Sequence, residues 1–357
     1  MIKQLAIEGV RNLDASVSLG SSANLLYGRN GSGKTSVLEA IHLLAVGRSF
    51  RANSAKPVIG FDRDHCLVTA TVTEGNRNQQ LGIQRSKDGS VIARINGEAV
   101  TSLAMLAEVL PVVVMDSGIV SLIDGQPEGR RRFIDASVFH VEQSFLPAWR
   151  RFQRALRQRN AGLRRGTLEG DEAWRREVAS AGQKLTEMRS VALDALQARF
   201  VASAEALSDD IAGMALVFRA GWDKTVGLLE ALERSLESDR LQGFTHVGPH
   251  RADIKLLIDG RPAAEVMSRG QLKLAATALK LAQGGLIAQQ SRSTPVYLVD
   301  DLLAELDSGH SRAVCDQLVA AGGQVVFTAV DRDEVPAFWS GSELTLFHVE
   351  QGSVVSV

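Results

Sequence analysis

The sequence predicts an α/β fold in which helices flank a mixed sheet and a helical lobe is inserted into the chain. Three observations point to this fold. Short apolar runs typical of strands dominate the first 110 residues and return after residue 243, a glycine-rich loop joins one run to a helical segment, and apolar residues recur at helical intervals between 130 and about 237. The predicted domains are accordingly 1–129, which holds the loop, the inserted lobe 130–242, and 243–357, which completes the first lobe.

The composition is that of an ordinary globular protein. The 357 residues are 45% apolar and 23% charged, and a net charge of −1 means that any nucleic acid must be bound by a local patch. Cys66 and Cys315 lie far apart without metal-ligand spacing, which predicts buried thiols in a reducing compartment. The N-terminal residues lack the pattern of a signal peptide, and no apolar run approaches the roughly 20 residues of a membrane span, so we expect a cytoplasmic protein that does not contact membranes.

The first 110 residues are expected to form mixed or antiparallel strands beside the glycine-rich loop. Apolar runs separated by glycine, asparagine and aspartate predict these strands at 5–10, 23–27, 66–72, 80–84 and 91–95, before a turn at Asn96 and Gly97. Further strands are expected at 110–115, 254–258, 295–299 and 323–328. A helix is expected over 272–283 that stops at Gly284 and Gly285.

The glycine-rich loop is the strongest single signal in the chain. It follows the strand 23–27, opens a helix expected to end near Gly47, and reads Gly28, Arg29, Asn30, Gly31, Ser32, Gly33, Lys34, Thr35. Glycines let backbone N–H groups surround phosphate oxygens, and the positive end of the helix favours the same charge. We therefore predict that residues 28–36, Ser36 included, bind a nucleoside triphosphate, with Lys34 on the β- and γ-phosphates and the Thr35 hydroxyl on Mg²⁺. The alternative is an ordinary glycine-rich turn.

Two acidic residues follow the strand at 295–299. An aspartate at the carboxyl end of a strand beside a phosphate loop can hold the water shell of Mg²⁺, which suits Asp300. Asp301 would then face the γ-phosphate and orient or deprotonate the attacking water. Lys34, Asp300 and Asp301 are thus the predicted catalytic residues, and Thr35 and Asp300 the predicted metal ligands. A cap at the strand end is the alternative for either aspartate.

A second possible anion site lies at the start of the helix 272–283. Its residues are Ser268, Arg269, Gly270 and Gln271, and a helix start with glycine at the position of close approach is suited to meet an anion. Ser268 is also a good N-cap, so a capped surface helix explains the same residues equally well.

The order of these signals resembles the ATP-binding-cassette type of ATPase head. Within that superfamily the chain resembles, nearly end to end, the RecF family of bacterial recombination and repair ATPases, which is related to the heads of SMC proteins. Besides the loop and the two aspartates, the resemblance rests on Arg11-Asn12-Leu13, Gly47-Arg48-Ser49-Phe50-Arg51, Arg131-Arg132-Phe133-Ile134-Asp135, Gly248-Pro249-His250-Arg251, Ser268 to Leu274 and Glu305-Leu306-Asp307. One departure is Met115-Asp116-Ser117-Gly118, where the family usually carries a Pro-Glu pair in a nucleotide-sensing loop.

The resemblance also implies roles for single residues. It implies that Ser268, Arg269, Gly270 and Gln271 of one subunit close on the ATP held by another, and that Asp307 belongs to the loop that crosses to the partner. Thr328 stands at the position of a switch residue, often histidine, that senses the γ-phosphate.

The function implied by the resemblance is that of a weak, DNA-stimulated ATPase of recombinational repair and replication-fork maintenance. ATP would drive dimerisation on duplex DNA at gaps and junctions, and slow hydrolysis would release the dimer. Mediators of the RecR and RecO type would cooperate with it to load recombinase. Two alternatives are the motor subunit of a transporter, for which the insert is unusually large and rich in arginine, and a small-molecule kinase, which leaves the 268–271 helix without a purpose.

The inserted lobe is expected to be compact and mostly helical, without a long coiled coil, because its apolar spacing does not keep a strict heptad. It carries a dense arginine series, and guanidinium groups suit phosphate contacts: Arg150, Arg151, Arg154, Arg157, Arg159, Arg164 and Arg165. The first four are the predicted DNA contacts, and Arg48 and Arg51 are rivals. A solvated helix face is the alternative for the whole series.

Overall fold

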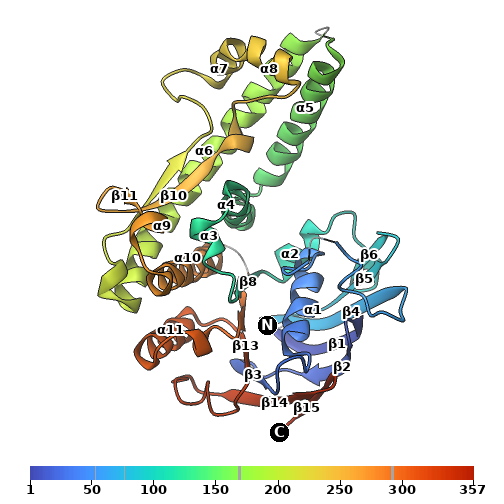
Figure 1. The fold of residues 1–357 in the computed structure, drawn as a ribbon. Helices are drawn as coiled ribbons and strands as arrows, with labels where there is room; N and C mark the ends of the chain where they lie inside the picture. Colours follow the sequence, from blue (N-terminus) through green and yellow to red (C-terminus); the bar gives the residue numbers. More distant parts are fainter. Residues whose placement is uncertain (53, 76, 168–169, 291–292) are drawn as a thin grey trace. The chain divides into compact units, whose positions relative to one another are not determined.

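The computed structural model describes residues 1–52, 54–75, 77–167, 170–290 and 293–357 (Figure 1). The chain forms two compact units. The first unit consists of Met1–Ile119, Ala206–Ser208 and Thr277–Val357, and the second of Val120–Glu205 and Asp209–Ala276. These limits differ from the predicted domain boundaries at 129 and 242, because strands and helices after residue 242 pack with the inserted helices.

A six-stranded, mainly parallel sheet forms the centre of the first unit. Its order is β15-β14-β3-β13-β12-β8, and all neighbours are parallel except β14 and β15. The strands are β3 (Ala23–Tyr27), β8 (Val112–Met115), β12 (Val296–Asp300), β13 (Val325–Ala329), β14 (Leu344–Glu350) and β15 (Ser353–Ser356). Because parallel strands end at the same edge of a sheet, the residues that follow β3, β8, β12 and β13 lie near one another.

The first unit also contains an antiparallel sheet, as expected for the N-terminal strands. Its order is β2-β1-β4-β5-β6-β7. The strands are β1 (Ile2–Val10), β2 (Leu13–Ser18), β4 (His65–Glu74), β5 (Arg77–Ser86), β6 (Val91–Ile95) and β7 (Glu98–Ala99). The predicted turn at Asn96 and Gly97 is confirmed, since both residues have the positive φ angles, 52° and 83°, that a tight hairpin requires.

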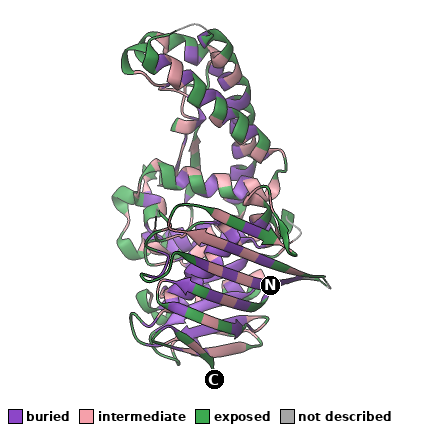
Figure 2. Ribbon diagram, turned by 90° about the vertical axis from the view of Figure 1, so that its right-hand side faces the viewer, coloured by how far each residue is buried: buried purple, intermediate pink, exposed green. Residues whose placement is uncertain are grey.

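The helix α1 (Lys34–Val46) packs against strands of both sheets. Most of its residues are buried, and its apolar side chains share one hydrophobic core with side chains of β1, β4, β12 and β13. Buried residues, purple in Figure 2, recur along the strands of this unit. The helix ends at Gly47, as predicted, in the left-handed conformation. The loop before α1 is therefore anchored on a helix that cannot shift without disturbing the core.

Two further helices of the first unit are α2 (Ala104–Val109) and α11 (Ser308–Ala321), and α10 (Arg269–Gln290) begins in the second unit and continues into the first. The prediction that this helix stops at Gly284 is wrong, because α10 continues through both glycines. A Cβ atom at Gly284 would lie 2.1 Å from the Tyr297 hydroxyl oxygen, so this glycine permits close packing of α10 on β12.

The second unit combines helices with a small antiparallel sheet of order β11-β10-β9. The helices are α3 (Ser121–Asp124), α4 (Pro127–Val141), α5 (Phe145–Arg165), α6 (Asp171–Leu207), α7 (Leu228–Arg234), α8 (Leu236–Gln242) and α9 (Ala263–Val266), and the strands β9 (Ala215–Arg219), β10 (Asp253–Ile258) and β11 (Arg261–Pro262). With 37 residues, α6 is about 55 Å long. The insert is therefore mostly helical, but β9 lies in a stretch that was expected to be helix. No helix in the described ranges is long and apolar enough to cross a bilayer.

Ion pairs join α5 to α6, and one of them involves Arg159, a member of the predicted arginine series. The Arg159 side chain is fully buried. It donates to Asp171 Oδ1 at 3.2 Å, to Asp239 Oδ2 at 2.7 Å and to Thr245 Oγ1 at 2.8 Å. Arg159 therefore ties α5, α6 and α8 together, and its interpretation as part of a DNA-facing series is wrong.

We expect Arg159→Lys to lower the free energy of unfolding by about 1–3 kcal/mol, because the single nitrogen of lysine cannot occupy the separate positions from which Nε reaches Asp171 and Nη1 reaches Asp239 and Thr245, so at least one of these buried hydrogen bonds is lost. Chemical denaturation measures the difference. Arg157→Lys is the matched control, since Arg157 is exposed on the same helix, and its effect should stay within about 0.5 kcal/mol. Equal midpoints for the two variants would contradict the structural role.

Candidate nucleotide-binding site

The glycine-rich loop connects β3 to α1 in the first unit. Gly28 has a φ of 152°, and a Cβ atom there would lie 2.3 Å from the Val349 carbonyl oxygen. The Gly28 N–H donates to the Ala329 carbonyl oxygen at 3.3 Å, and the Gly352 N–H donates to the Ser32 carbonyl oxygen at 3.0 Å. The loop is therefore held against β13 and the hairpin of β14 and β15, and its first position accepts only glycine.

Lys34 lies inside this loop. Its side chain is buried, and its Nζ donates to the carbonyl oxygens of Gly28 at 2.7 Å and Arg29 at 3.2 Å. The hydroxyl of Ser32 is buried and has no hydrogen-bond partner within the described residues. A buried ammonium next to an unsatisfied hydroxyl suits an anion with several acceptor oxygens, which is the chemistry of a triphosphate.

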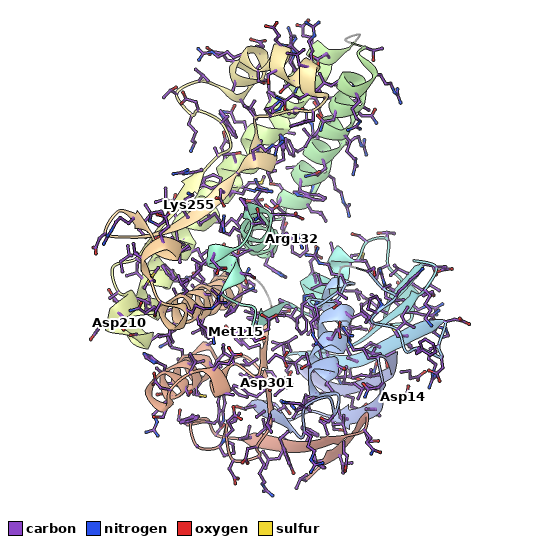
Figure 3. All side chains as sticks on the ribbon, in the orientation of Figure 1. Asp14, Met115, Arg132, Asp210, Lys255 and Asp301 are labelled. Carbon is purple, nitrogen blue, oxygen red and sulfur yellow. The ribbon has the colours of Figure 1, made fainter. Side chains whose placement is uncertain are left out.

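Hydroxyl and carboxyl groups meet at the carboxyl edge of the parallel sheet. Thr35 Oγ1 donates to Asp300 Oδ1 at 2.8 Å, and Thr328 Oγ1 lies 2.8 Å from the same oxygen. The Thr328 hydroxyl also lies 3.1 Å from Asp301 Oδ1 and accepts from the Asp301 N–H at 2.9 Å. The structure thus brings Thr35, Asp300, Asp301 and Thr328 together, and Figure 3 labels Asp301 where β12 ends.

This edge fits a divalent cation. Burial raises the pKa of Asp300 above its usual range, while hydrogen bonds from Thr35 and Thr328 oppose that shift and the charge of Asp301 adds to it. A cation beside two neighbouring carboxylates would favour their ionised form. The hydroxyl of Thr35 and the Asp300 carboxylate are the hard oxygen ligands that Mg²⁺ prefers.

A third acidic residue ends a neighbouring strand. Met115 of β8, labelled in Figure 3, pairs with Val299 of β12, so Asp116 follows β8 beside Asp300. Burial raises the pKa of Asp116, and burial lowers the pKa of Lys280 on α10 to about 8 against the attraction of Asp116. Asp116 is not among the predicted site residues, although it follows a buried parallel strand just as Asp300 does. It occupies the stretch 115–118, where the chain departs from the family pattern.

The segment that follows α1 contains Arg51, whose positive charge acts on the acidic residues at the carboxyl edge of the parallel sheet. Burial is the main cause of the raised pKa of Asp116 and Asp300, and the positive charge of Arg51 acts against it on both. The segment is held by Ser49, whose hydroxyl accepts from the Arg51 N–H at 2.9 Å and donates to the buried carboxylate of Glu39. The charge of Arg51 therefore acts on the candidate nucleotide site, while contact of Arg48 and Arg51 with DNA stays a prediction.

Arg11, a motif residue that the sequence left without a role, forms a partly buried ion pair with Glu39 of α1. Arg11 Nη2 donates to Glu39 Oε1 at 3.0 Å, and the side chain of Glu39 has no exposed surface. Arg11 therefore neutralises the carboxylate that holds Ser49. The spacing of Arg11 and Glu39 along the chain gives no indication of this contact, which forms only when β1 packs beside α1.

Glu334, which lies beyond β13, is a further acidic residue that sequence reasoning missed. Its pKa is raised by burial and by the charges of Asp301 and Asp331, and Lys34 acts in the opposite direction. Its Oε1 atom is buried and has no hydrogen-bond partner in the described part of the chain. Glu334 thus adds negative charge next to the phosphate loop.

The residues 268–271 lie in the second unit. The Ser268 N–H donates to Gln271 Oε1 at 2.9 Å, and the Gln271 N–H donates to Ser268 Oγ at 3.3 Å, which is the reciprocal arrangement of a capping box. The expectation that Ser268 caps this helix is confirmed. Ser268, Arg269 and Gly270 are exposed on the surface of their unit.

Asp307 has a capping role as well. Its Oδ1 accepts from the N–H groups of Gly309 and His310, both at 3.0 Å, at the start of α11, and most of its side chain is exposed. These hydrogen bonds lower the pKa of Asp307. Capping therefore accounts for Asp307 within one chain, and its place in a partner-crossing loop stays a prediction.

Four of the predicted DNA contacts lie on α5, and three of them line one hollow. Arg150, Arg151 and Arg154 line a hollow of about 180 Å³ with Trp174 and Glu177 of α6. Arg151 Nη2 donates to Glu177 Oε2 at 2.6 Å, so part of its charge is already balanced. Arg154 and Arg157 are exposed.

Comparison with known proteins identifies the family of the chain. The family model of the RecF/RecN/SMC N-terminal domain matches residues 1–352. A DNA replication and repair protein RecF of Stutzerimonas stutzeri is 42% identical over 361 residues, covering all of this chain and 97% of the relative, and one of Pseudomonas putida is 44% identical over 359 residues, covering 99% and 97%.

Solved structures share the fold. A structure of the recombination mediator protein RecF with ATP has a TM-score of 0.88 at 24% identity, covering all of this chain and 97% of that one. An Smc head bound to the C-terminal winged-helix domain of ScpA has a TM-score of 0.60 at 16% identity, covering 100% and 97%. The family match over nearly the whole chain, together with relatives above 40% identity, shows that the chain belongs to the RecF family.

Proposed function

We propose that this protein is an ATP-dependent DNA-binding ATPase of recombinational repair and replication-fork maintenance. The observation that supports it most is the hydrogen-bonded group of Thr35, Asp300, Asp301 and Thr328 beside Lys34, because it combines an anion-binding loop with oxygen ligands for Mg²⁺. The names of the relatives, which are DNA replication and repair proteins, support the choice of DNA as partner.

Each residue of the proposed site has a separate role. Residues 28–36 bind the triphosphate of ATP through backbone N–H groups, and the Lys34 ammonium leaves its carbonyl partners to neutralise the β- and γ-phosphates. Thr35 and Asp300 hold Mg²⁺, which supplies positive charge where negative charge develops in the transition state. Asp301 accepts the proton of the attacking water, and Thr328 keeps Asp300 and Asp301 at fixed separation.

The second half of the site comes from another copy of the chain. Ser268, Arg269 and Gly270 are exposed and Gln271 is half-buried at a helix start, where N–H groups can meet the γ-phosphate bound by the partner copy. Asp307 belongs to the loop that would cross to the partner copy beside this helix start. ATP therefore favours a homodimer on duplex or gapped DNA, slow DNA-stimulated hydrolysis opens it, and mediators of the RecR and RecO type act with it to load recombinase.

We expect Ser268→Arg to prevent ATP-driven dimerisation while each copy still binds ATP, because the longer cation blocks the approach of the helix start without touching residues 28–36. Sedimentation velocity with and without ATP measures the dimer, and a fluorescent ATP analogue measures binding. Ser238→Arg is the matched control, since Ser238 is exposed on α8 of the same unit. Loss of ATP binding in the Ser268 variant would contradict a site shared by two copies.

DNA binding is tested directly by titrating a labelled gapped duplex at several salt concentrations. The proposal expects a steep fall of affinity with salt, because phosphate contacts release counterions, and tighter binding with ATP. A transporter motor would not bind the duplex. A small-molecule kinase would turn over at a rate per chain that does not depend on protein concentration, whereas a two-copy site gives a rate that rises with concentration.

A further inference from the structure

A hollow of about 520 Å³ in the second unit carries cations and aromatic rings that the candidate nucleotide site does not use. Its lining comes from the end of β9, the loop that follows, and the start of β10. The residues that matter are Phe218, Arg219, Trp222, Lys224, Arg251 and Asp253. A volume of this size accommodates a ligand as large as a nucleotide.

The hollow is positively charged. Arg219, Lys224 and Arg251 are exposed, and no ion pair joins any of them to a carboxylate within the described residues. The one lining carboxylate, Asp253, accepts from Arg130 Nε at 2.7 Å and from Arg130 Nη2 at 3.1 Å, so its charge is already balanced. Three cations therefore line the hollow without a carboxylate partner in the part of the chain that the structure describes, and Arg251 also lies over the Phe244 ring, with its Cζ 5.3 Å from the ring centroid.

Aromatic rings lie among these cations. Lys224 Nζ lies 5.9 Å from the centroid of the Phe218 ring, and Trp222 stands half-buried on the loop after β9. The loop is ordered by the Gly248 N–H, which donates to the Gly221 carbonyl oxygen at 3.1 Å, and by the Thr225 N–H, which donates to Asp223 Oδ1 at 2.9 Å. Trp222 is thus presented from a preformed loop, which reduces the entropy lost when a ligand stacks on it.

Two ligands combine negative charge with a flat or apolar group: an unpaired nucleotide and an acidic peptide with an aromatic residue. A peptide would add as a strand to the open edge of β9. The first part of that edge is occupied, because the Leu216 N–H donates to Gln197 Oε1 at 2.6 Å and Gln197 Nε2 donates to the Met214 carbonyl oxygen at 3.4 Å, which leaves little edge for a peptide strand to pair with. Aromatic rings with cations along a groove are instead the arrangement that binds single-stranded nucleic acid.

We propose that this hollow binds an unpaired nucleotide of a DNA strand, with the base on Trp222 and the flanking phosphates on Arg219, Lys224 and Arg251. The proposal rests on the proposed function in one respect, namely that the chain binds DNA. It adds a surface separate from the arginines of α5, and it gives the protein a means to distinguish gapped DNA from continuous duplex, since a paired base cannot reach the ring.

The test compares a fluorescein-labelled gapped duplex with a continuous duplex of the same length, by anisotropy and with a non-hydrolysable ATP analogue present. We expect Trp222→Ala to weaken binding of the gapped duplex at least about five-fold, because base stacking on an aromatic ring contributes about 1–3 kcal/mol, and to change binding of the continuous duplex less than two-fold. Trp222→Phe should retain most of the affinity.

A double variant of exposed residues, Arg219→Gln with Lys224→Gln, tests the same hollow independently in case Trp222→Ala misfolds. It should also weaken binding of the gapped duplex at least about five-fold. Arg240→Gln with Lys184→Gln is the matched control, because both residues are exposed in the same unit and the charge change is equal. Photocrosslinking from 5-iododeoxyuridine placed in the gap should label the peptide that contains Trp222.

Each outcome is decisive. If the parent protein binds neither DNA, the proposed function fails; if the parent binds both and the Trp222 and Arg219 variants bind like the control, only the nucleotide pocket is wrong. Equal losses on gapped and continuous duplex would indicate a phosphate patch and overturn the base contact. A labelled peptide of aspartates and one phenylalanine is the second probe. If the Trp222 and Arg219 variants retain DNA binding but lose binding of this peptide, the hollow belongs to a protein partner and the nucleotide pocket is wrong.

Discussion

Lys34→Ala is expected to abolish ATP binding, with a loss of affinity of about a hundred-fold or more. The substitution removes the one buried ammonium of the loop, which lies 2.7 Å from the Gly28 carbonyl oxygen and is the closest cation to the phosphates in the proposed complex. Truncating one partner of a buried charge pair costs about 2–5 kcal/mol. Equilibrium titration with a fluorescent ATP analogue measures the loss.

Lys3→Ala is the matched control, because Lys3 is an exposed lysine of β1 in the same unit and should leave ATP binding unchanged. Melting temperatures of both variants show whether the fold is intact. Affinity within about three-fold of the parent for Lys34→Ala would mean that the phosphates are held by other residues, and the proposed site would have to be abandoned.

Asp301→Asn should retain ATP binding but lower the hydrolysis rate about a hundred- to ten-thousand-fold, which is the contribution of a general base. An amide cannot accept the proton of the attacking water. The fold should tolerate the change, since Asp301 has a φ of 49° and asparagine adopts this left-handed conformation as readily as aspartate. In the proposed cycle hydrolysis releases the dimer, so the ATP-bound dimer should accumulate in sedimentation experiments.

The matched control for Asp301 is Asp331→Asn, which makes the same carboxylate-to-amide change at an exposed position beyond β13. Its hydrolysis rate should stay within about two-fold of the parent. Normal hydrolysis by Asp301→Asn would exclude Asp301 as the base. Glu334, whose carboxylate also stands near Lys34, would then be the next residue to substitute.

The sequence predicted those parts of the fold that depend on neighbours along the chain. The strands 23–27 and 91–95 match β3 and β6, and α1 ends where Gly47 permits the left-handed conformation. Asp300 could be placed at the sheet edge because a short apolar run ending in a polar residue is typical of a buried parallel strand. These signals are local, so one sequence is sufficient to read them.

Contacts between distant residues could not be read in this way. Arg159 resembles its exposed neighbours on α5 in sequence, and only the packing of Asp239, 80 residues away, shows that it is buried. Gly284 has the appearance of a helix stop, yet the ring of Tyr297 explains it through close packing. Asp116 gains its place beside Asp300 from the pairing of β8 with β12, which no local pattern specifies.

The hydrogen bonds of the Gln197 side chain to the open edge of β9 have a consequence for how copies of the chain assemble. An uncovered strand rim is a template for pairing between molecules, and copies brought together at high local concentration are especially exposed to such aggregation. By occupying the main-chain groups of Met214 and Leu216, the side chain of Gln197 protects the small sheet from strand exchange between molecules. In the proposed function, association of copies would then use the surface at residues 268–271 and not this strand edge.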